Sequence, residues 1–314
     1  MQTKRQIQEL LATAGVAPNR RLGQHFLVDL NLMRLLVEAA QIGPADVVLE
    51  IGAGTGSLTQ ALAHHAGCVV TVELDRTLAG IAASQLAQAA NVRIVNDDVL
   101  SGKGTLNPVV VEAVTEARLS LGEKGPHGPQ GPQEPASAGG RVLLVSNLPY
   151  DVASSVMINL VKGPVTADAM FVTVQKEVAE RMTARPGGRD YGTLSIFLQA
   201  TGAVELLRVL KPSVFWPPPG VDSAVVRYAR DEARSRRIAD RELFGSVVGL
   251  FIGHRRKMLR ACVKQAPPEL GDRDLWLRIF EQHALDPTRR PEELLPEQYV
   301  DLANTCHRLL HARR

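Results

Sequence analysis

The chain has 314 residues, of which 45% are hydrophobic, 22% charged and 4% aromatic, and its formal net charge is +3. Domains of roughly 100 to 200 residues suggest one large and one smaller domain, and no apolar run approaches the roughly 18 residues of a membrane span. A membrane protein is thereby excluded, while so small a net charge leaves a nucleic-acid partner undecided.

Seven short runs of β-branched or apolar residues predict strands. They cover residues 47–51, 69–74, 92–95, 142–145, 170–174, 204–210 and 224–228. Segments of helical character, including 58–66, 78–88 and 154–161, lie between the first six runs. This alternation is typical of a parallel, doubly wound α/β sheet. Residues 122–140 interrupt it with a Gly- and Pro-rich stretch, which predicts a flexible surface loop.

The pattern changes after residue 228 to a charged stretch and then to apolar residues at helical spacing, with no further strand candidates. We therefore expect an N-terminal arm and α/β domain over residues 1–229 and a helical domain over residues 230–314. A basic cluster without acidic residues lies in the second of these and indicates a helix that contacts phosphate groups, the alternative being a solvated helix face. Its members are Arg255, Arg256, Lys257, Arg260 and Lys264.

The three cysteines, Cys68, Cys262 and Cys306, are too few in 314 residues for a disulfide framework. None of them stands in a CxxC pair, so a zinc or redox site is not indicated. A reducing, cytoplasmic location is expected. The first fifteen residues lack the apolar segment of a secretory signal, and Glu9 counts against an amphipathic transit peptide.

A glycine-rich turn, Gly52-Ala53-Gly54-Thr55-Gly56, follows the first predicted strand and precedes a helix. Glycines permit a tight turn and a close ligand approach, and the helix N-terminus offers free N–H groups. The dinucleotide fingerprint requires a third glycine where Ser57 stands, so the spacing favours the pattern of S-adenosylmethionine-dependent methyltransferases over a nicotinamide oxidoreductase.

Acidic residues follow the second and third predicted strands. Glu73 lies about 20 residues beyond the glycines, where a carboxylate can accept hydrogen bonds from both ribose hydroxyls of an adenosyl group. A solvated charge at a strand end is the alternative for Glu73. The third predicted strand ends in Asn96-Asp97-Asp98, where a carboxylate can accept a hydrogen bond from an adenine amine.

The sequence Asn147-Leu148-Pro149-Tyr150 ends the fourth predicted strand, so all four motifs fall at the carboxyl edge of the sheet. The amine of adenine is a poor nucleophile because its lone pair is delocalised into the ring. The Asn147 side-chain carbonyl and the Leu148 backbone carbonyl can hold its hydrogens. Pro149 stiffens the turn, and Tyr150 offers a flat face against which an extruded base can stack.

Together these residues resemble the small-subunit ribosomal RNA adenine dimethyltransferases, and the resemblance covers nearly the whole chain. It includes Arg21-Leu22-Gly23-Gln24-His25-Phe26-Leu27 and the aromatic, proline-rich residues 211–219. The resemblance implies a Rossmann-like S-adenosylmethionine-dependent methyltransferase sheet with a smaller all-α RNA-binding domain. It assigns the cofactor contacts to His25, Leu27, Gly52, Glu73, Asp98 and Asn147. Phe215 would face Tyr150 across the target base, the alternative being that it packs on the core.

The resemblance also implies the reaction, in which methyl groups pass from S-adenosylmethionine to the exocyclic amines of two adjacent adenines in the 3′-terminal hairpin loop of 16S rRNA. The partners would be small-subunit RNA and the pre-30S particle during ribosome biogenesis, the protein would be a monomer, and no metal is expected. One alternative is a large-subunit methyltransferase of the macrolide-resistance type, which commonly carries Ile where Leu148 stands. A second alternative is a non-catalytic RNA-binding assembly factor. The intact motif at residues 147–150 argues against it.

Overall fold

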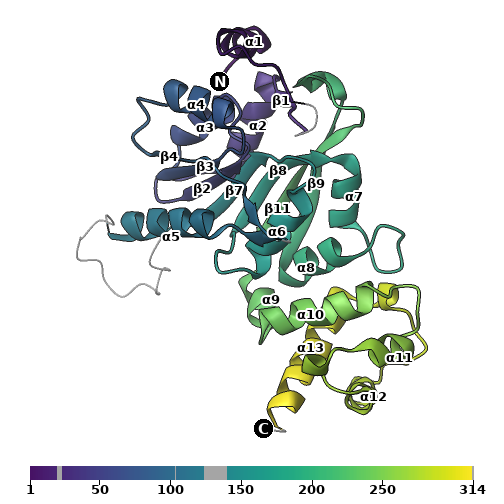
Figure 1. Ribbon diagram of the computed structural model, residues 1–314. Helices are drawn as coiled ribbons and strands as arrows, with labels where there is room; N and C mark the ends of the chain where they lie inside the picture. The colour runs from purple at the N-terminus through teal and green to yellow at the C-terminus, as the bar shows by residue number, and fades with distance from the viewer. Residues whose placement is uncertain (20–22, 103, 124–139, 313–314) are drawn as a thin grey trace. The chain divides into compact units, whose positions relative to one another are not determined.

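The computed structural model describes residues 1–19, 23–102, 104–123 and 140–312. Figure 1 shows the chain, which divides into two compact units. Unit 1 consists of Met1–Leu160, Pro164–Ala179 and Glu205–Tyr228, and unit 2 of Val161–Gly163, Glu180–Val204 and Ala229–Arg314. The second unit therefore takes residues from within the α/β sequence as well as from the C-terminal part of the chain.

Unit 1 is built around a seven-stranded sheet in which every predicted strand is present. In spatial order the strands are β4 (Val92–Val95), β3 (Cys68–Val72), β2 (Val47–Ile51), β7 (Val142–Asn147), β8 (Ala169–Gln175), β11 (Ser223–Arg230) and β9 (Gly202–Leu210). The five strands from β4 to β8 pair in parallel. Residues of β2 and β3 are buried without alternation, as expected for strands covered on both faces. The predicted α/β class is confirmed.

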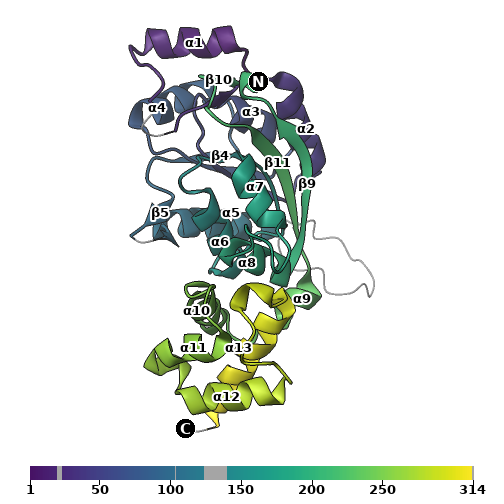
Figure 2. The same ribbon diagram turned by 90° about the vertical axis from the view of Figure 1, so that its right-hand side faces the viewer.

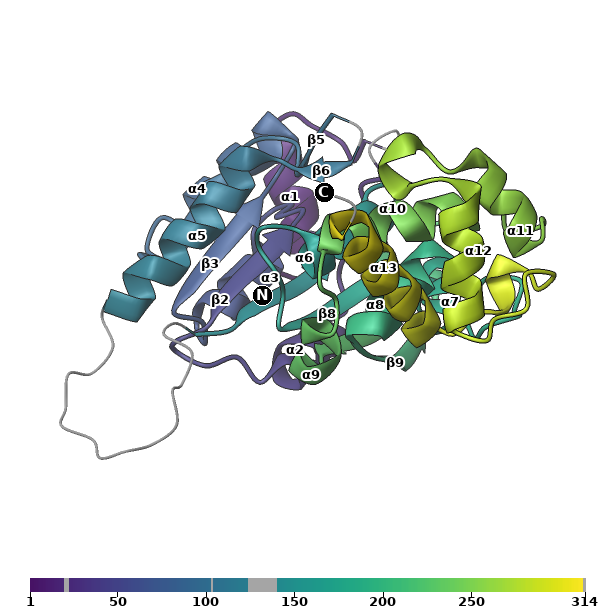
Figure 3. The ribbon, with the colours of Figure 1, turned by 90° about the horizontal axis from the view of Figure 1, so that it is seen from below.

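Helices cover both faces of this sheet, as Figure 3 shows for α2 and α5, which lie on opposite faces. α5 packs on β2, β3 and β4, whereas α2 packs on β7 and β8 and against α3. The helices are α1 (Lys4–Thr13), α2 (Leu30–Ala40), α3 (Ser57–Ala63), α4 (Arg76–Gln85), α5 (Pro108–Glu123), α6 (Ala153–Lys162) and α7 (Lys176–Thr183). The predicted helices at 58–66, 78–88 and 154–161 correspond to α3, α4 and α6.

Helix α1 and two short strand pairs were not predicted from the sequence. Thr3 begins α1 with a capping box that it forms with Gln6, and Ile7 packs with Phe26 and Leu78. β1 (Phe26–Leu27) pairs antiparallel with β10 (Phe215–Trp216), and β5 (Leu100–Ser101) pairs antiparallel with β6 (Thr105–Leu106). The first pair joins the N-terminal segment to the proline-rich segment. Next to it His25 contacts Pro217, which is 192 residues away in the sequence.

Unit 2 is helical, and within the described part of the chain no strand follows Arg230 (Figure 2). Its helices are α8 (Thr193–Thr201), α9 (Glu232–Arg236), α10 (Arg241–Ile252), α11 (Leu259–Cys262), α12 (Arg273–Gln282) and α13 (Pro296–His311), with 3-10 turns at Val263–Gln265, Pro268–Leu270 and Pro291–Glu293. Phe251 of α10 lies at the centre of its core and contacts the rings of Trp276, Phe280 and Tyr299.

Two further expectations concern the chain as a whole. None of the helices found among the described residues is long and apolar enough to span a membrane. Most of the Gly- and Pro-rich segment predicted as a surface loop, residues 124–139, lies outside the described residues, as do Arg21 and Leu22 of the N-terminal motif.

Candidate active site

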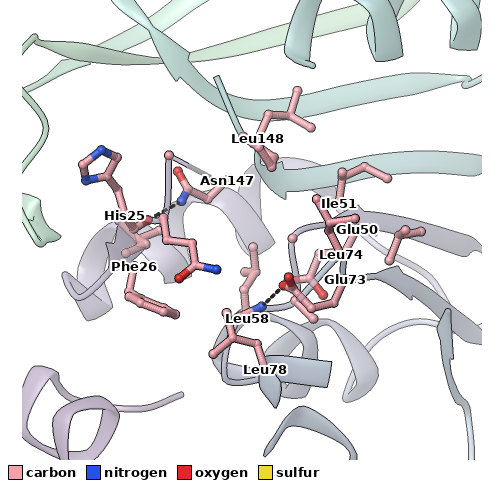
Figure 4. Close-up of a pocket in the computed structure, with 18 of the residues that line it drawn as sticks. His25, Phe26, Glu50, Ile51, Leu58, Glu73, Leu74, Leu78, Asn147 and Leu148 are labelled. Atoms are coloured by element: carbon pink, nitrogen blue, oxygen red, sulfur yellow. Dashed lines mark hydrogen bonds between the residues drawn. The ribbon is translucent and has the colours of Figure 1, made fainter. Parts of the chain in front are cut away.

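A pocket opens at the carboxyl edge of the parallel strands, where doubly wound sheets bind their ligands. It brings together nine of the residues predicted from sequence for cofactor and base. These are His25, Leu27, Gly52, Glu73, Asp98, Asn147, Leu148, Pro149 and Tyr150. Figure 4 shows Asn147 between His25 on one side and Leu58 and Glu73 on the other.

The glycine turn has the backbone that only glycine adopts readily. Gly52, Gly54 and Gly56 have φ angles of 86°, 57° and 82°. A Cβ on Gly54 would come within 3.1 Å of the Phe26 ring, so a side chain here is opposed both by the backbone and by its neighbour. The turn therefore leaves its backbone accessible to a ligand at the start of α3.

Glu73 is only 6% exposed, and burial raises the pKa of its carboxyl group. Oε2 accepts the Gly54 N–H at 2.8 Å, and Oε1 accepts the Asp75 N–H at 2.9 Å. These bonds fix the carboxylate beside the glycine turn, and each oxygen retains a second lone pair for a ligand hydroxyl. Asp98, in contrast, is exposed at the rim, where Oδ1 accepts the Leu100 N–H at 2.9 Å.

A second buried acid, Glu50, also lines the pocket. It is 1% exposed, and its Oε2 accepts hydrogen bonds from Thr59 Oγ1 at 2.6 Å and from Thr71 Oγ1 at 2.7 Å. Burial raises its pKa to about 8, although both threonine hydroxyls favour the carboxylate. In the sequence Glu50 lies within a run of apolar residues that predicts a buried strand, and this distinguishes it from a surface acid.

The N-terminal segment completes the wall of the pocket. Gln2 is 7% exposed; its Nε2 donates to Thr55 O at 3.1 Å, and its Oε1 accepts from Thr55 Oγ1 at 2.6 Å. Its backbone N–H donates to Ser57 Oγ at 2.7 Å, and Ile7 of α1 lines the pocket. Sequence reasoning missed both residues, because nothing local in the sequence indicates contact with a turn some fifty residues away.

The side-chain amide of Asn147 is oriented by one hydrogen bond, in which Nδ2 donates to His25 O at 2.9 Å (Figure 4). Oδ1 is buried and has no hydrogen-bond partner among the described residues. A buried acceptor without a partner costs about 1–3 kcal/mol, so such atoms call for a functional explanation. Leu148 is fixed by its N–H, which donates to Thr173 O at 3.1 Å.

Two aromatic side chains lie beside Asn147. The rings of Tyr150 and His25 are 5.7 Å apart between centroids and tilted by 30°. Burial raises the pKa of the Tyr150 hydroxyl, which lies 2.9 Å from Ser223 Oγ. The structure does not bring Phe215 to this pair: it is 3% exposed, pairs with Leu27 across β1 and β10, and belongs to the hydrophobic core.

The basic cluster of unit 2 differs from the expected single helix. α10 ends at Ile252, so Arg255, Arg256 and Lys257 stand in a turn that precedes α11. Arg255 Nε lies 2.8 Å from Glu292 Oε2, and its Nη2 donates to Arg189 O at 2.9 Å. Arg256, Lys257, Arg260 and Lys264 are exposed. Arg255 is thus held within unit 2, whereas the other members of the cluster face solvent.

Comparisons with known proteins show the family to which the chain is similar. The family model for ribosomal RNA adenine dimethylase matches residues 16–304. A ribosomal RNA small subunit methyltransferase A from Pelotomaculum thermopropionicum is 37% identical over 300 residues, covering 95% of each chain, and one from a Geobacillus species is 32% identical, covering 96% of each.

Two solved structures share the fold. A dimethyladenosine transferase from Plasmodium falciparum has a TM-score of 0.65 and 21% identity, covering 88% of this chain and 96% of that one. The 23S rRNA methyltransferase ErmE has a TM-score of 0.54 and 23% identity, covering 90% of this chain and 99% of that one. At these identities the likeness is one of fold alone.

Proposed function

The chain belongs to the ribosomal RNA adenine dimethylases, and from this membership we infer that it is an S-adenosylmethionine-dependent methyltransferase of small-subunit rRNA. Its substrates are the exocyclic amines of two adjacent adenines in the 3′-terminal hairpin loop of 16S rRNA, which become dimethyladenosines during ribosome biogenesis. The partner is then the pre-30S particle, in the cytoplasm. The observation that carries this proposal is the buried Oδ1 of Asn147, which finds no hydrogen-bond partner in the part of the chain that the structure describes and shares a pocket with the glycine turn and Glu73.

The residues present fit S-adenosylmethionine. Glu73 offers lone pairs for the two ribose hydroxyls, and the glycine turn leaves room where a Cβ would intrude. Asp98 would accept a hydrogen bond from the adenine amine of the cofactor at the rim, and His25, Leu27 and Gly52 would form the remaining wall. When bound, the cofactor supplies an activated methyl group on a sulfonium centre.

The chain itself then has to hold the target amine in line with that methyl group, and positioning accounts for most of the rate. Because Asn147 Nδ2 is engaged by His25 O, its Oδ1 can only face the amine as an acceptor. The Leu148 carbonyl accepts the second amine hydrogen, Pro149 stiffens the turn, and the base stacks on Tyr150. Phe215 supports this wall from the core.

Contact with rRNA also needs a surface for phosphate groups. Arg256, Lys257 and Arg260 are exposed and supply it, and Arg255 orients the turn that holds Arg256 and Lys257 through its ion pair with Glu292. Each exposed cation that neutralises a phosphate steepens the dependence of binding on salt.

The proposal is tested with immature small subunits and labelled S-adenosylmethionine. The protein should add close to four methyl groups to two adjacent adenines. Asn147→Ala should abolish transfer while cofactor binding stays measurable. Asn91→Ala is the matched control, since its amide also donates to backbone carbonyls but lies outside the pocket, and it should retain transfer. Methylation of large-subunit RNA instead, or of neither RNA, would contradict the proposal.

A further inference from the structure

The two rings beside Asn147 are both held by the segment that leads from β10 to β11. The Tyr150 hydroxyl lies 2.9 Å from Ser223 Oγ, and Ser223 is fully buried at the start of β11. His25 Nδ1 lies 2.7 Å from Pro217 O, and since a carbonyl only accepts, Nδ1 carries the hydrogen. Each ring is therefore held at its polar end, and the two residues that hold them, Pro217 and Ser223, lie close together in the sequence.

These ties restrict rings that packing alone leaves partly free, because both His25 and Tyr150 are only half-buried. A tyrosine ring pivots about two side-chain torsions, and a hydrogen bond at the hydroxyl, the atom farthest from the backbone, limits both. Residues 217–223 thus act on the pocket through the Pro217 carbonyl and the Ser223 hydroxyl, while the side chain of Phe215 stays in the core.

The first and the second methyl transfer to one adenine depend to different degrees on a fixed Tyr150 ring. An unmethylated amine has two hydrogens, which Asn147 Oδ1 and the Leu148 carbonyl can both accept. After one methylation a single hydrogen remains, so one of these hydrogen bonds is lost and stacking has to hold more of the base. The second transfer therefore depends more strongly on a fixed Tyr150 ring than the first.

Resting on the proposed function, we propose that Ser223 is a positioning residue that fixes the Tyr150 ring for the second methyl transfer. Ser223→Ala and Tyr150→Phe each remove the same hydrogen bond from opposite sides. Each should slow the second transfer by about threefold to tenfold, the range of a single hydrogen bond, and affect the first transfer less. Monomethyladenine should then accumulate, and the dissociation constant of S-adenosylmethionine should not change.

The test measures mono- and dimethyladenine over time by mass spectrometry, on small-subunit RNA treated with the parent, both single variants and the double variant. The double variant should be no slower than either single variant, because all three lack one interaction. Ser195→Ala is the control, since it removes a buried serine hydroxyl bond in unit 2, and its product ratio should match the parent. If Ser223→Ala fails to fold, the ratio of mono- to dimethyladenine produced by Tyr150→Phe still tests the inference.

Parental product ratios in both single variants would overturn the inference, as would additive losses in the double variant or an equal loss of both transfers with weaker cofactor binding. These outcomes leave the proposed function intact. Absence of dimethyladenine from small-subunit RNA treated with the parent protein would overturn the proposed function instead.

Discussion

Replacement of Glu50 by glutamine should make the protein more stable than the parent at alkaline pH. The glutamine carbonyl can still accept the hydroxyls of Thr59 and Thr71, whereas the buried negative charge can no longer form. In the folded chain burial raises the pKa of Glu50 to about 8, against an ordinary value of 4.5. The folded state therefore binds the proton more tightly, and stability is lost as the pH rises from the unfolded towards the folded value.

The difference between these two pKa values corresponds to on the order of 5 kcal/mol in total, of which about 3 kcal/mol falls between pH 5.5 and 8.5. Urea unfolding of parent and Glu50→Gln at several pH values measures it, because subtracting the two curves removes the titration of all other groups. Between pH 5.5 and 8.5, the free energy of unfolding of the variant should rise relative to that of the parent by about 3 kcal/mol. Parallel curves would refute the reasoning and show that Glu50 is ionised throughout or that the fold relaxes around its charge.

The remaining predictions concern unit 2 and the N-terminal segment. Arg255→Ala should lower the stability of the protein by about 1–3 kcal/mol, because it removes charge-assisted hydrogen bonds inside unit 2. Arg256→Ala should leave the melting temperature unchanged but weaken RNA binding, and it should reduce the slope of log K against log salt concentration by about one. Lower stability with unchanged RNA binding would contradict a role of Arg256 in phosphate contact. Gln2→Ala, which removes both side-chain bonds to Thr55, should weaken cofactor binding about fivefold by calorimetry, whereas Gln8→Ala on the exposed face of α1 should not.

The central sheet could be predicted because its signal is local. Buried parallel strands such as β2, β3, β7 and β8 need nearly continuous apolar residues. The seven runs in the sequence correspond to the seven strands of this sheet. Helix α1 was missed although Thr3 and Gln6 carry the pattern of a capping box and Ile7 and Leu11 lie four residues apart on one face. Its burial depends on Phe26 and Leu78, which only the folded chain brings to it.

Residue types and strand ends were likewise enough to predict Gly52, Glu73 and Asn147, since the carboxyl edge of the sheet collects them. The roles of Phe215 and Arg255 depend on partners elsewhere in the chain. Phe215 lies on a two-residue strand whose pairing with Leu27 turns its ring to the core. Arg255 is bound by an acid 37 residues away, which a count of neighbouring charges does not reveal.

The order of the strands explains why motifs so far apart in sequence meet at one pocket. β2 lies between β3 and β7, so the loops that follow β2 and β7 diverge and leave a crevice at the carboxyl edge. The backbone pairing ends at Leu49 with Leu144, and Ser146 Oγ then bridges to both the N–H and the C=O of Ile51. Gly52 and Asn147, the next residues after this bridge, both line the pocket.

The same geometry accounts for the place of the Gly- and Pro-rich segment. Its ends join the chain at Glu123, the end of α5, and at Gly140, two residues before β7 begins at Val142. The pocket residues follow the other end of β7, at Asn147. Added length at the amino end of a strand leaves the register of that strand with β2 and β8 unchanged, because the register is fixed by the pairs from Val142 onward. An insertion there can therefore vary in length without displacing Asn147 or the residues that orient it.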